Sequence, residues 1–443
     1  MKITNTAGNR QFGKMAGIVL NSTAVLRLNF CAKLNICASI SATSPSCKTL
    51  AVSKKDTTKT IMSNEKLYFK NLDSIRFIAA LMVFLQHAVS PSYQYLPIKN
   101  TFWEKLLITM SNGGTGVSIF FVLSGFLITY LLISEYELNS KISIKNFYIR
   151  RLLRIWPLYF LVVAFSFLIY PFLKSLIGMN NPLGSNFLYH LTFLSNFDVI
   201  NIEKHCFGSD AMSQNITWSV SIEEQFYLFW PLIFMFLPKR LWVYSISIVI
   251  LGSILFRIIN NNDGVVLYFH TFSVLLDLGI GGLMAFLIKS NKQFRSLFEN
   301  SSTLTHITLF IFSFCLVFWG DKLFFFNYGA AIGRVFVSFS FALIISAQAI
   351  TKRKSKLDLG NMSFANKWGK YTYGIYLIHP IAITIIDILV RTMHFPKTNF
   401  IALFSIGTIG FVLTLFLSKI SFRYYESRFL SLKEKYTTIQ TRE

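Results

Sequence analysis

Residues 72–88 (LDSIRFIAALMVFLQHA) form a largely apolar stretch with an arginine, Arg76, near one end and a histidine, His87, near the other. In a helix the two side chains lie about 16 Å apart along the axis, roughly half the thickness of a bilayer's hydrocarbon core. Ionisable groups at such depth are costly and mark functional sites. The spacing predicts an anion held by Arg76 at one membrane face and proton transfer by His87 far from that face.

Two further segments supply a carboxylate and a pair of cations. The stretch WSVSIEEQFYLFWPLI begins at Trp218 and carries Glu223 a turn or two from its start. A carboxylate that meets His87 would hold the imidazole in one tautomer, as in catalytic triads. In FYIRRLLRIWPLY, Arg151 and Arg154 share one helix face, and guanidinium groups match phosphate geometry. This pair predicts a phosphate-bearing donor; contact with lipid headgroups is the alternative.

Two small motifs complete the candidates. Ser124 lies in FFVLSGFLIT, where no base is adjacent in the sequence, so we interpret Ser124-Gly125 as a site of close helix packing. His379 precedes Pro380, which interrupts the backbone hydrogen bonds of the helix and can open a local site. For both His87 and His379 the alternative is a histidine that only satisfies a nearby carbonyl group.

Composition restricts the class of protein. Of 443 residues, 53% are hydrophobic and only 14% are charged, which indicates a polytopic membrane protein rather than a soluble one. The net charge of +23 does not predict a nucleic-acid partner, because the basic residues fall between apolar segments rather than on one polar face. The five cysteines show neither a disulfide framework nor a metal-ligand spacing, so we expect no metal.

Hydropathy predicts an all-α bundle of about ten transmembrane spans. The short apolar patch 187–197 is expected not to cross the membrane, because counting it would place the later basic clusters outside, against the positive-inside rule. Both termini are then cytoplasmic, and His87 and Glu223 both lie in the outer half of the membrane. The predicted spans are 73–89, 114–134, 155–176, 218–238, 241–260, 268–288, 303–320, 330–350, 371–391 and 399–420.

The chain divides into three parts by composition. Residues 1–61 are rich in Ser, Thr, Asn and Ala, and their first acidic residue is Asp56. This extension is either a targeting peptide or sequence upstream of a true start at Met62, and we exclude it from the fold. Residues 62–436 form the predicted transmembrane domain, and 437–443 form a cytoplasmic tail.

Taken together and in this order, the motifs resemble the acyltransferase-3 family of integral membrane acyltransferases, which includes O-acetylases of lipopolysaccharide O-antigen, exopolysaccharide and peptidoglycan. The resemblance covers residues 68–436. Two departures are Ser74, where the family usually has Gly, and residues 425–428, which lack the proline of the family's Glu-x-Pro. The matching residues are Arg76 and His87 (Arg, ten residues, His), Arg151 and Arg154 (Arg-x-x-Arg), Trp218, Glu223 and Tyr227 (Trp-Ser-x-x-x-Glu-x-x-Phe-Tyr), and Tyr376, His379 and Pro380.

The resemblance implies an O-acetyltransferase of the bacterial inner (plasma) membrane that moves an acyl group, acetyl by expectation, from cytoplasmic acyl-CoA to a hydroxyl of an envelope glycan. Some members carry a fused extracytoplasmic hydrolase-like domain; here we expect direct transfer or a separate extracytoplasmic partner. The implied roles are donor binding by Arg76, Arg151 and Arg154, general base catalysis by His87 oriented by Glu223, and substrate contact or support by Ser124, Trp218, Tyr376 and His379. A passage between the arginines and His87 is required.

Two other functions remain as alternatives. A proton-coupled transporter or flippase of a glycan precursor would also use membrane His, Glu and Arg residues. Such proteins often show repeats with matching broken helices, and the first and second five predicted spans show no such correspondence. A receptor or scaffold would need neither the cationic pair nor a His and a Glu at one depth.

Overall fold

The computed structural model describes residues 68–89, 101–176, 184–205, 215–353, 355–393 and 400–437. These residues belong to one compact unit, Ser63–Glu443. Their regular secondary structure is entirely helical. The predicted extension 1–61 and most of the predicted tail, residues 438–443, lie outside the described residues.

Seven helical segments in the described residues are long and apolar enough to cross a membrane, or up to eight if a pair bent by 94° counts as one span. The expected ten spans are thus matched in part. The two predicted spans that are not counted form helices α2 (Lys70–Val89) and α10 (Thr217–Phe236). These carry the ionisable residues that lower their mean hydropathy. The candidate spans are Phe102–Asn139, Ile144–Ser175, Lys239–Ile259, Gly264–Ser290, Gly329–Ile350, Thr372–Val390 and Phe404–Tyr436, and the bent pair is Lys292–Glu299 with Thr303–Phe318.

The patch predicted not to span forms two short helices, α7 (Phe187–Leu191) and α8 (Ser195–Lys204). Neither is long enough to cross a hydrocarbon core. The other short elements are α3 (Phe102–Met110), η2 (Phe165–Ile169), α6 (Tyr170–Leu176), η3 (Lys239–Leu241), α12 (Gly264–Phe269), α14 (Lys292–Glu299), α16 (Gly320–Leu323), η4 (Leu359–Asn361), α18 (Ser363–Gly369), η5 (Phe422–Glu426), α21 (Ser427–Lys433) and η6 (Glu434–Tyr436).

Helix α4 (Gly113–Asn139) packs against α2, α10, α13 (Thr271–Ser290) and α17 (Gly329–Ile350). Its contact with α13 is made backbone to backbone through two glycines. A Cβ atom at Gly125 would lie 1.9 Å from the carbonyl oxygen of Leu278, and one at Gly281 would lie 2.0 Å from that of Val122. Small residues permit such close approach of membrane helices. Of the two residues predicted to allow close packing, Ser124 and Gly125, the glycine makes the close contact.

Helices α2 and α4 run antiparallel. The backbone NH of Gly113, at the start of α4, donates to Gln86 Oε1 at 3.2 Å. At the other end, the ring of Phe69 meets that of Tyr130 with centroids 5.3 Å apart. His87 therefore lies level with the beginning of α4, and Arg76 lies further along it.

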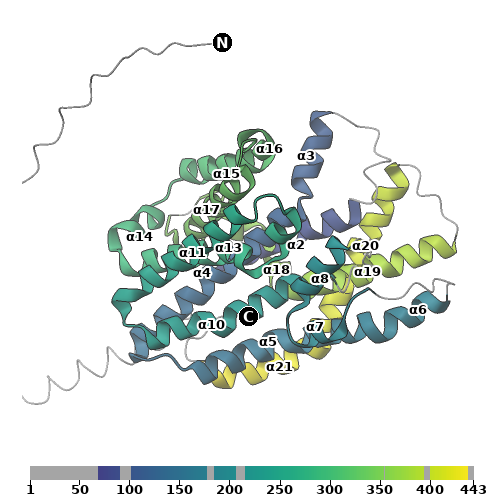
Figure 1. Ribbon diagram of the computed structural model, residues 1–443, viewed down its shortest axis with the longest axis horizontal. Helices are drawn as coiled ribbons and strands as arrows, with labels where there is room; N and C mark the ends of the chain where they lie inside the picture. Colours follow the sequence, from purple (N-terminus) through teal and green to yellow (C-terminus); the bar gives the residue numbers. More distant parts are fainter. Residues whose placement is uncertain are drawn as a thin grey trace, which may run out of the picture. The chain divides into compact units, whose positions relative to one another are not determined.

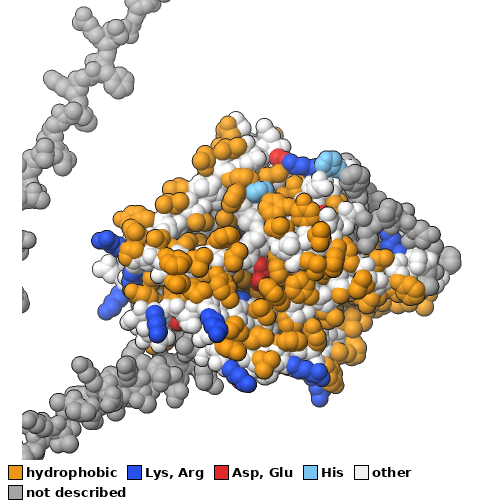
Figure 2. All heavy atoms as spheres, turned by 60° about the horizontal axis from the view of Figure 1, so that its bottom comes forward, with side chains coloured by type: hydrophobic (Ala, Val, Ile, Leu, Met, Phe, Trp, Pro, Cys, Tyr) orange, Lys and Arg blue, Asp and Glu red, His pale blue; other side chains and the backbone are white. Residues whose placement is uncertain are grey.

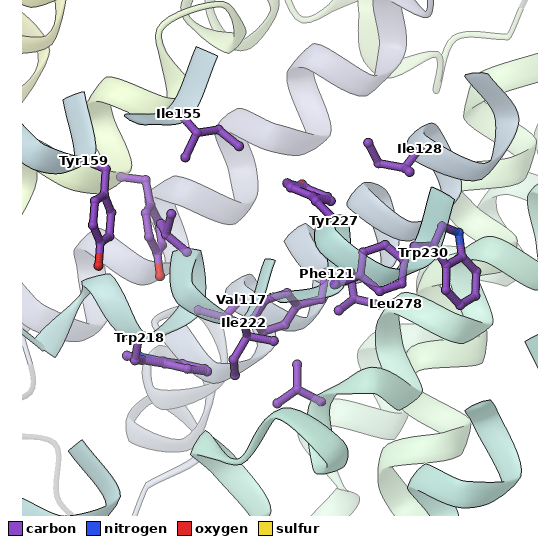
Figure 3. Packing of buried hydrophobic residues seen from close by; sticks show 14 of the residues in the cluster. Val117, Phe121, Ile128, Ile155, Tyr159, Trp218, Ile222, Tyr227, Trp230 and Leu278 are labelled. Atoms are coloured by element: carbon purple, nitrogen blue, oxygen red, sulfur yellow. The ribbon is translucent and has the colours of Figure 1, made fainter. Parts of the chain in front are cut away.

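Helix α5 (Ile144–Ala164) contacts α21, and α19 (Thr372–Thr392) packs between α2 and α20 (Phe400–Ser421). Figure 1 shows α5 and α21 side by side. The remaining long helices are α11 (Trp242–Ile259) and α15 (Thr303–Phe318). Side chains of α4, α5, α10 and α13 meet in one apolar cluster (Figure 3). The face in Figure 2 is mostly hydrophobic, with Lys and Arg side chains near its margin, as expected for a surface in contact with lipid.

Candidate active site

A cavity of about 870 Å³ lies among α2, α4, α5, α10 and α19. On α4 its lining extends from Val117 to Glu135, which is about 27 Å of helix. That length approaches the thickness of a hydrocarbon core. The cavity can therefore hold a long, thin molecule along α4.

The end of the cavity near Glu135 is basic. Arg150 donates to Glu135 Oε2 at 3.1 Å, and Arg76 is paired with Asp73. Arg151 lies over the ring of Tyr227, with its guanidinium carbon 5.3 Å from the centroid. The structure thus brings Arg76, Arg151 and Arg154 to one cavity. The basic lining residues are Lys70, Arg76, Arg150, Arg151, Arg154, Lys367, Lys370 and Lys433.

Glu223 faces the cavity from α10, but its hydrogen bonds do not go to His87. Ser124 Oγ donates to Glu223 Oε1 at 2.6 Å, and Tyr227 donates to Oε2 at 3.2 Å. The expected contact between Glu223 and His87 is therefore wrong. Its physical reason is that Gly125 lets α4 approach α13 closely, which leaves the neighbouring Ser124 to face α10. Ser124 thus has a base beside it that no sequence neighbour provides.

His87 pairs instead with His379. His87 Nδ1 lies 2.8 Å from His379 Nε2, and the two rings are stacked with centroids 5.1 Å apart. His379 is buried, and its Nδ1 lies 3.2 Å from the carbonyl oxygen of Ile375. Because a carbonyl only accepts, the neutral tautomer of His379 carries its proton on Nδ1 and accepts at Nε2. His87 then donates from Nδ1, so Nε2 of His87 is the nitrogen with a lone pair for a proton.

Neither histidine is among the described residues that line the cavity. The end of the cavity nearest to them contains Tyr376 and Ser219, whose hydroxyl oxygens are 2.5 Å apart. The Tyr376 ring lies 6.1 Å from that of His379, one helical turn further along α19. The expected open passage to His87 is thus corrected: among the described residues, the lining reaches Tyr376 and Ser219 but not the two histidines.

Comparison with known proteins decides the family. The acyltransferase-3 model, described as an acyltransferase domain, matches residues 69–420. The chain belongs to the acyltransferase-3 family.

Relatives of this acyltransferase-3 chain are bacterial. It is 29% identical over 338 residues to the peptidoglycan O-acetyltransferase OatA of Listeria monocytogenes, covering 72% of this chain and 50% of that protein. It is 31% identical over 230 residues to the O-acetyltransferase OatA of Staphylococcus aureus, covering 50% of this chain and 35% of that protein. The chain therefore spans half or less of the length of these relatives. No solved structure matches it significantly.

The family motifs differ in where they lie. Trp218 is buried and packs against Phe121, Tyr268 and Phe269, with ring centroids 5.0 to 6.0 Å away, so it supports the end of the cavity near Ser219. Glu426, in the segment that lacks the family's proline, lines the cavity and accepts a hydrogen bond from Ser421 at 2.8 Å.

Among the described residues, no group of three or more His, Cys, Asp or Glu side chains is placed to hold a metal ion.

Sequence reasoning missed several lining residues. Lys367, Lys370 and Lys433 line the basic end, and Tyr373 lines the cavity one turn before Tyr376. The spacing of these lysines does not indicate a binding site, because they belong to basic clusters that the positive-inside rule already explains. Tyr373 had a weak signal, since it lies three residues before Tyr376 and residues at that spacing are neighbours on a helix surface.

Proposed function

We propose that this acyltransferase-3 protein moves an acyl group, acetyl in the first instance, from acyl-CoA at the basic end of the cavity to a hydroxyl of an envelope glycan at the histidine end. The observation that carries the proposal is a cationic cavity about 27 Å long that ends one helical turn short of an imidazole pair. The names of the relatives support an acetyl donor and a glycan acceptor.

The donor is bound by charge and shape. Arg151 and Arg154 hold the phosphates, because planar guanidinium groups match phosphate oxygens in pairs. The pantetheine arm runs along α4 past Ser124. Arg76 lies further along the cavity, where its pairing with Asp73 fixes the side chain. Glu223 balances the charge of Arg151 and anchors Ser124 and Tyr227, and so acts as a positioning residue.

The reaction needs one base and correct positioning. The acceptor oxygen attacks the thioester carbonyl carbon while His87 Nε2 takes the hydroxyl proton. The new C–O bond forms as the C–S bond breaks, and the proton passes to the thiolate of CoA. His379 holds His87 in the required tautomer through the 2.8 Å contact, in place of the carboxylate expected from the sequence.

The acyl group must pass the contact between Tyr376 and Ser219. One hydrogen bond contributes about 0.5–1.5 kcal/mol net, so opening it reduces the population of the transfer-ready state by no more than about tenfold. A donor whose arm displaces the Tyr376 hydroxyl can offset that cost. The closed contact keeps water away from the thioester until then.

We place the basic end in the cytoplasm and the histidine pair in the outer half of the bacterial plasma membrane, following the positive-inside rule. Acyl-CoA is then available at the basic end, and envelope glycans are available at the other. Transfer is either direct or through a separate extracytoplasmic partner. Both routes use the same donor site and the same base.

The test uses membrane vesicles that contain the protein, labelled acetyl-CoA and an envelope glycan fraction. We expect ester-linked label on the glycan that is lost with His87→Ala, while labelled acetyl-CoA still binds. Full transfer by the variant would refute the base assignment. A transporter or flippase would leave no ester on the glycan and would not need the donor, so binding of acetyl-CoA that is lost with Arg154→Ala separates the two functions.

A further inference from the structure

A second group of charged side chains lies where α11, α13 and α17 pack together (Figure 1). Asp277 on α13 is fully buried and accepts hydrogen bonds from Arg334 Nε at 3.1 Å and from Arg334 Nη2 at 2.5 Å. Arg257 on α11 is also buried and donates to Ser273, one turn before Asp277. We call Arg257, Asp277 and Arg334 the arginine cluster, and none of the three is among the described residues that line the cavity.

The arginine cluster has more positive than negative charge. The hydrogen bonds of Arg257 go to two backbone carbonyl oxygens and a serine hydroxyl, and none goes to a carboxylate among the described residues. Guanidinium groups stay protonated in proteins, so two cations share the one carboxylate of Asp277. A charge within the membrane is costly unless an opposite charge compensates it. The cluster can therefore be completed by one more anionic group.

The arginine cluster lies toward the histidine end of the fold. On α17, the carbonyl oxygen of Gln348 accepts a hydrogen bond from Asn71 at the start of α2, with a length of 3.0 Å. That part of α17 is therefore level with the basic end of the cavity. Arg334 precedes Gln348 by 14 residues in the same helix, which is about 21 Å along the axis. Arg334 thus lies on the same side of the fold as His87.

Tyr268 lies between the arginine cluster and the histidine end. Its ring centroid is 5.2 Å from that of Trp218, which supports the end of the cavity. Its hydroxyl reaches the start of α4, which is level with His87: a Cβ atom at Gly114 would lie 3.2 Å from that oxygen. Tyr268 and Arg334 also act on each other electrostatically.

Both Tyr268 and Arg334 have polar atoms that can bind a ligand. Tyr268 is 38% exposed and the Arg334 side chain is 21% exposed, whereas Asp277 is fully buried. Among the described residues, the Tyr268 hydroxyl makes no hydrogen bond, and Arg334 donates only from Nε and Nη2. One hydroxyl and one guanidinium nitrogen, Nη1 of Arg334, are therefore available beside the histidine end.

We infer that Arg334 and Tyr268 bind the acceptor and select a glycan that carries an anionic group, a carboxylate or a phosphate, near the acceptor hydroxyl. The inference rests on the proposed function. Arg334 Nη1 donates to the anionic oxygen, and the Tyr268 hydroxyl donates to the same group. The charge of Arg257 adds to the attraction, and Asp277 holds the Arg334 guanidinium in place through two hydrogen bonds.

The test measures transfer of labelled acetyl from acetyl-CoA to an envelope glycan fraction by the detergent-purified full chain, with small sugars added as competitors. N-acetylmuramic acid and its methyl ester differ in one carboxylate charge. N-acetylglucosamine 1-phosphate and N-acetylglucosamine differ in one phosphate. We expect the anionic member of one pair to inhibit about 10- to 100-fold more strongly than its neutral partner, the range for a charge-assisted hydrogen bond. The pair that shows the difference identifies the anionic group.

Three variants test the residues. The double variant Asp277→Asn with Arg334→Met removes the ion pair without leaving a buried charge alone, and should abolish the preference for the anionic competitor. Tyr268→Phe removes only the hydroxyl and should weaken the anionic competitor severalfold. Lys322→Met, which changes an exposed lysine on α16, is the matched control and should behave as wild type. All three should bind acetyl-CoA as the wild type does, because none of these residues lines the donor cavity.

Equal inhibition by the anionic and neutral members of both pairs overturns the inference and leaves the proposed function intact. A preference that survives in the double variant also overturns it, because the anion then binds elsewhere. If the double variant does not fold, Tyr268→Phe decides: an unchanged anionic competitor contradicts the inference. Failure of the wild type to form any ester on the glycan refutes the proposed function itself.

Discussion

His87 and His379 lie 292 residues apart in the chain, and a 2.8 Å contact joins His87 Nδ1 to His379 Nε2. The contact links α2 to α19 and leaves the lone pair of His87 on its far nitrogen, Nε2. In the proposed reaction, a histidine takes the orienting place that a carboxylate holds in the familiar triads. Unlike a carboxylate, a neutral imidazole orients its neighbour without adding charge to a buried site.

Substitution of His87 and substitution of His379 should lower the transfer rate to different extents. His87→Ala should lower the transfer rate by about 10²- to 10⁴-fold, the range for loss of a general base, with unchanged donor affinity. His379→Ala should lower the rate less, because His87 keeps its own lone pair but loses its fixed tautomer. Rates of acetyl transfer over a range of pH measure both. His205→Ala, which changes an exposed histidine on another helix end, should behave as wild type. Equal rates in all three variants would contradict the assignment.

Arg154→Ala should weaken acetyl-CoA binding by about 10- to 100-fold, because a charge-assisted contact to phosphate is lost. Isothermal titration of the purified protein measures the change. Arg240→Ala is the control, since Arg240 is exposed and is not among the lining residues. Equal affinities in the two variants would remove Arg154 from the donor site.

Tyr376→Phe should raise acceptor-independent hydrolysis of acetyl-CoA by severalfold. The variant removes the hydroxyl that meets Ser219 at 2.5 Å, so water reaches the thioester from the histidine end. Release of free thiol in the absence of glycan is the measurement. Ser219→Ala should give the same increase, because it removes the other half of the contact. A rate that stays at the wild-type level in both variants would show that this hydrogen bond does not exclude water.

Gly125→Ala should destabilise the fold by about 1–3 kcal/mol or prevent insertion, because its Cβ would lie 1.9 Å from the carbonyl oxygen of Leu278. Gly252→Ala is the matched control, with no atom within 4 Å of the added Cβ. It should be neutral or slightly stabilising, since alanine favours a helix. Thermal unfolding in detergent compares the two, and equal midpoints would show that α4 and α13 separate freely.

Asp277→Asn should destabilise the protein by about 3–5 kcal/mol, the range for breaking a buried ion pair. Asp277 is fully buried on α13 and accepts hydrogen bonds from Arg334 Nε at 3.1 Å and from Arg334 Nη2 at 2.5 Å. Replacing both residues, with Asp277→Asn and Arg334→Met, should recover part of the loss, because no uncompensated charge remains. Unfolding midpoints of the single and double variants measure this, and additive losses would contradict it.

Periodicity and hydropathy predicted the helical class and placed most helices, because apolar stretches of span length have few other structures available. Seven or eight of the ten predicted spans are apolar enough in the described residues to cross a membrane. The other two form α2 and α10, which carry charged residues that face the cavity. The resemblance implied that Arg76, Arg151 and Arg154 bind one donor, and all three line the same cavity.

Partners within the site could not be predicted. Depth along a helix is readable from sequence, but rotation about the helix axis depends on tertiary packing. Gly125 leaves Ser124 facing Glu223, and α19 brings His379 rather than Glu223 to His87. No local pattern specifies either rotation.

The basic end of the cavity is built from elements that lie far apart in the chain, since Lys70 comes from α2 and Lys433 comes from α21. During synthesis the ribosome must therefore complete α21 before this anion-binding surface exists. A nascent chain that has inserted only its early helices lacks the cation that α21 contributes to the cavity. In the proposed function, this order of assembly delays donor binding until the domain is whole.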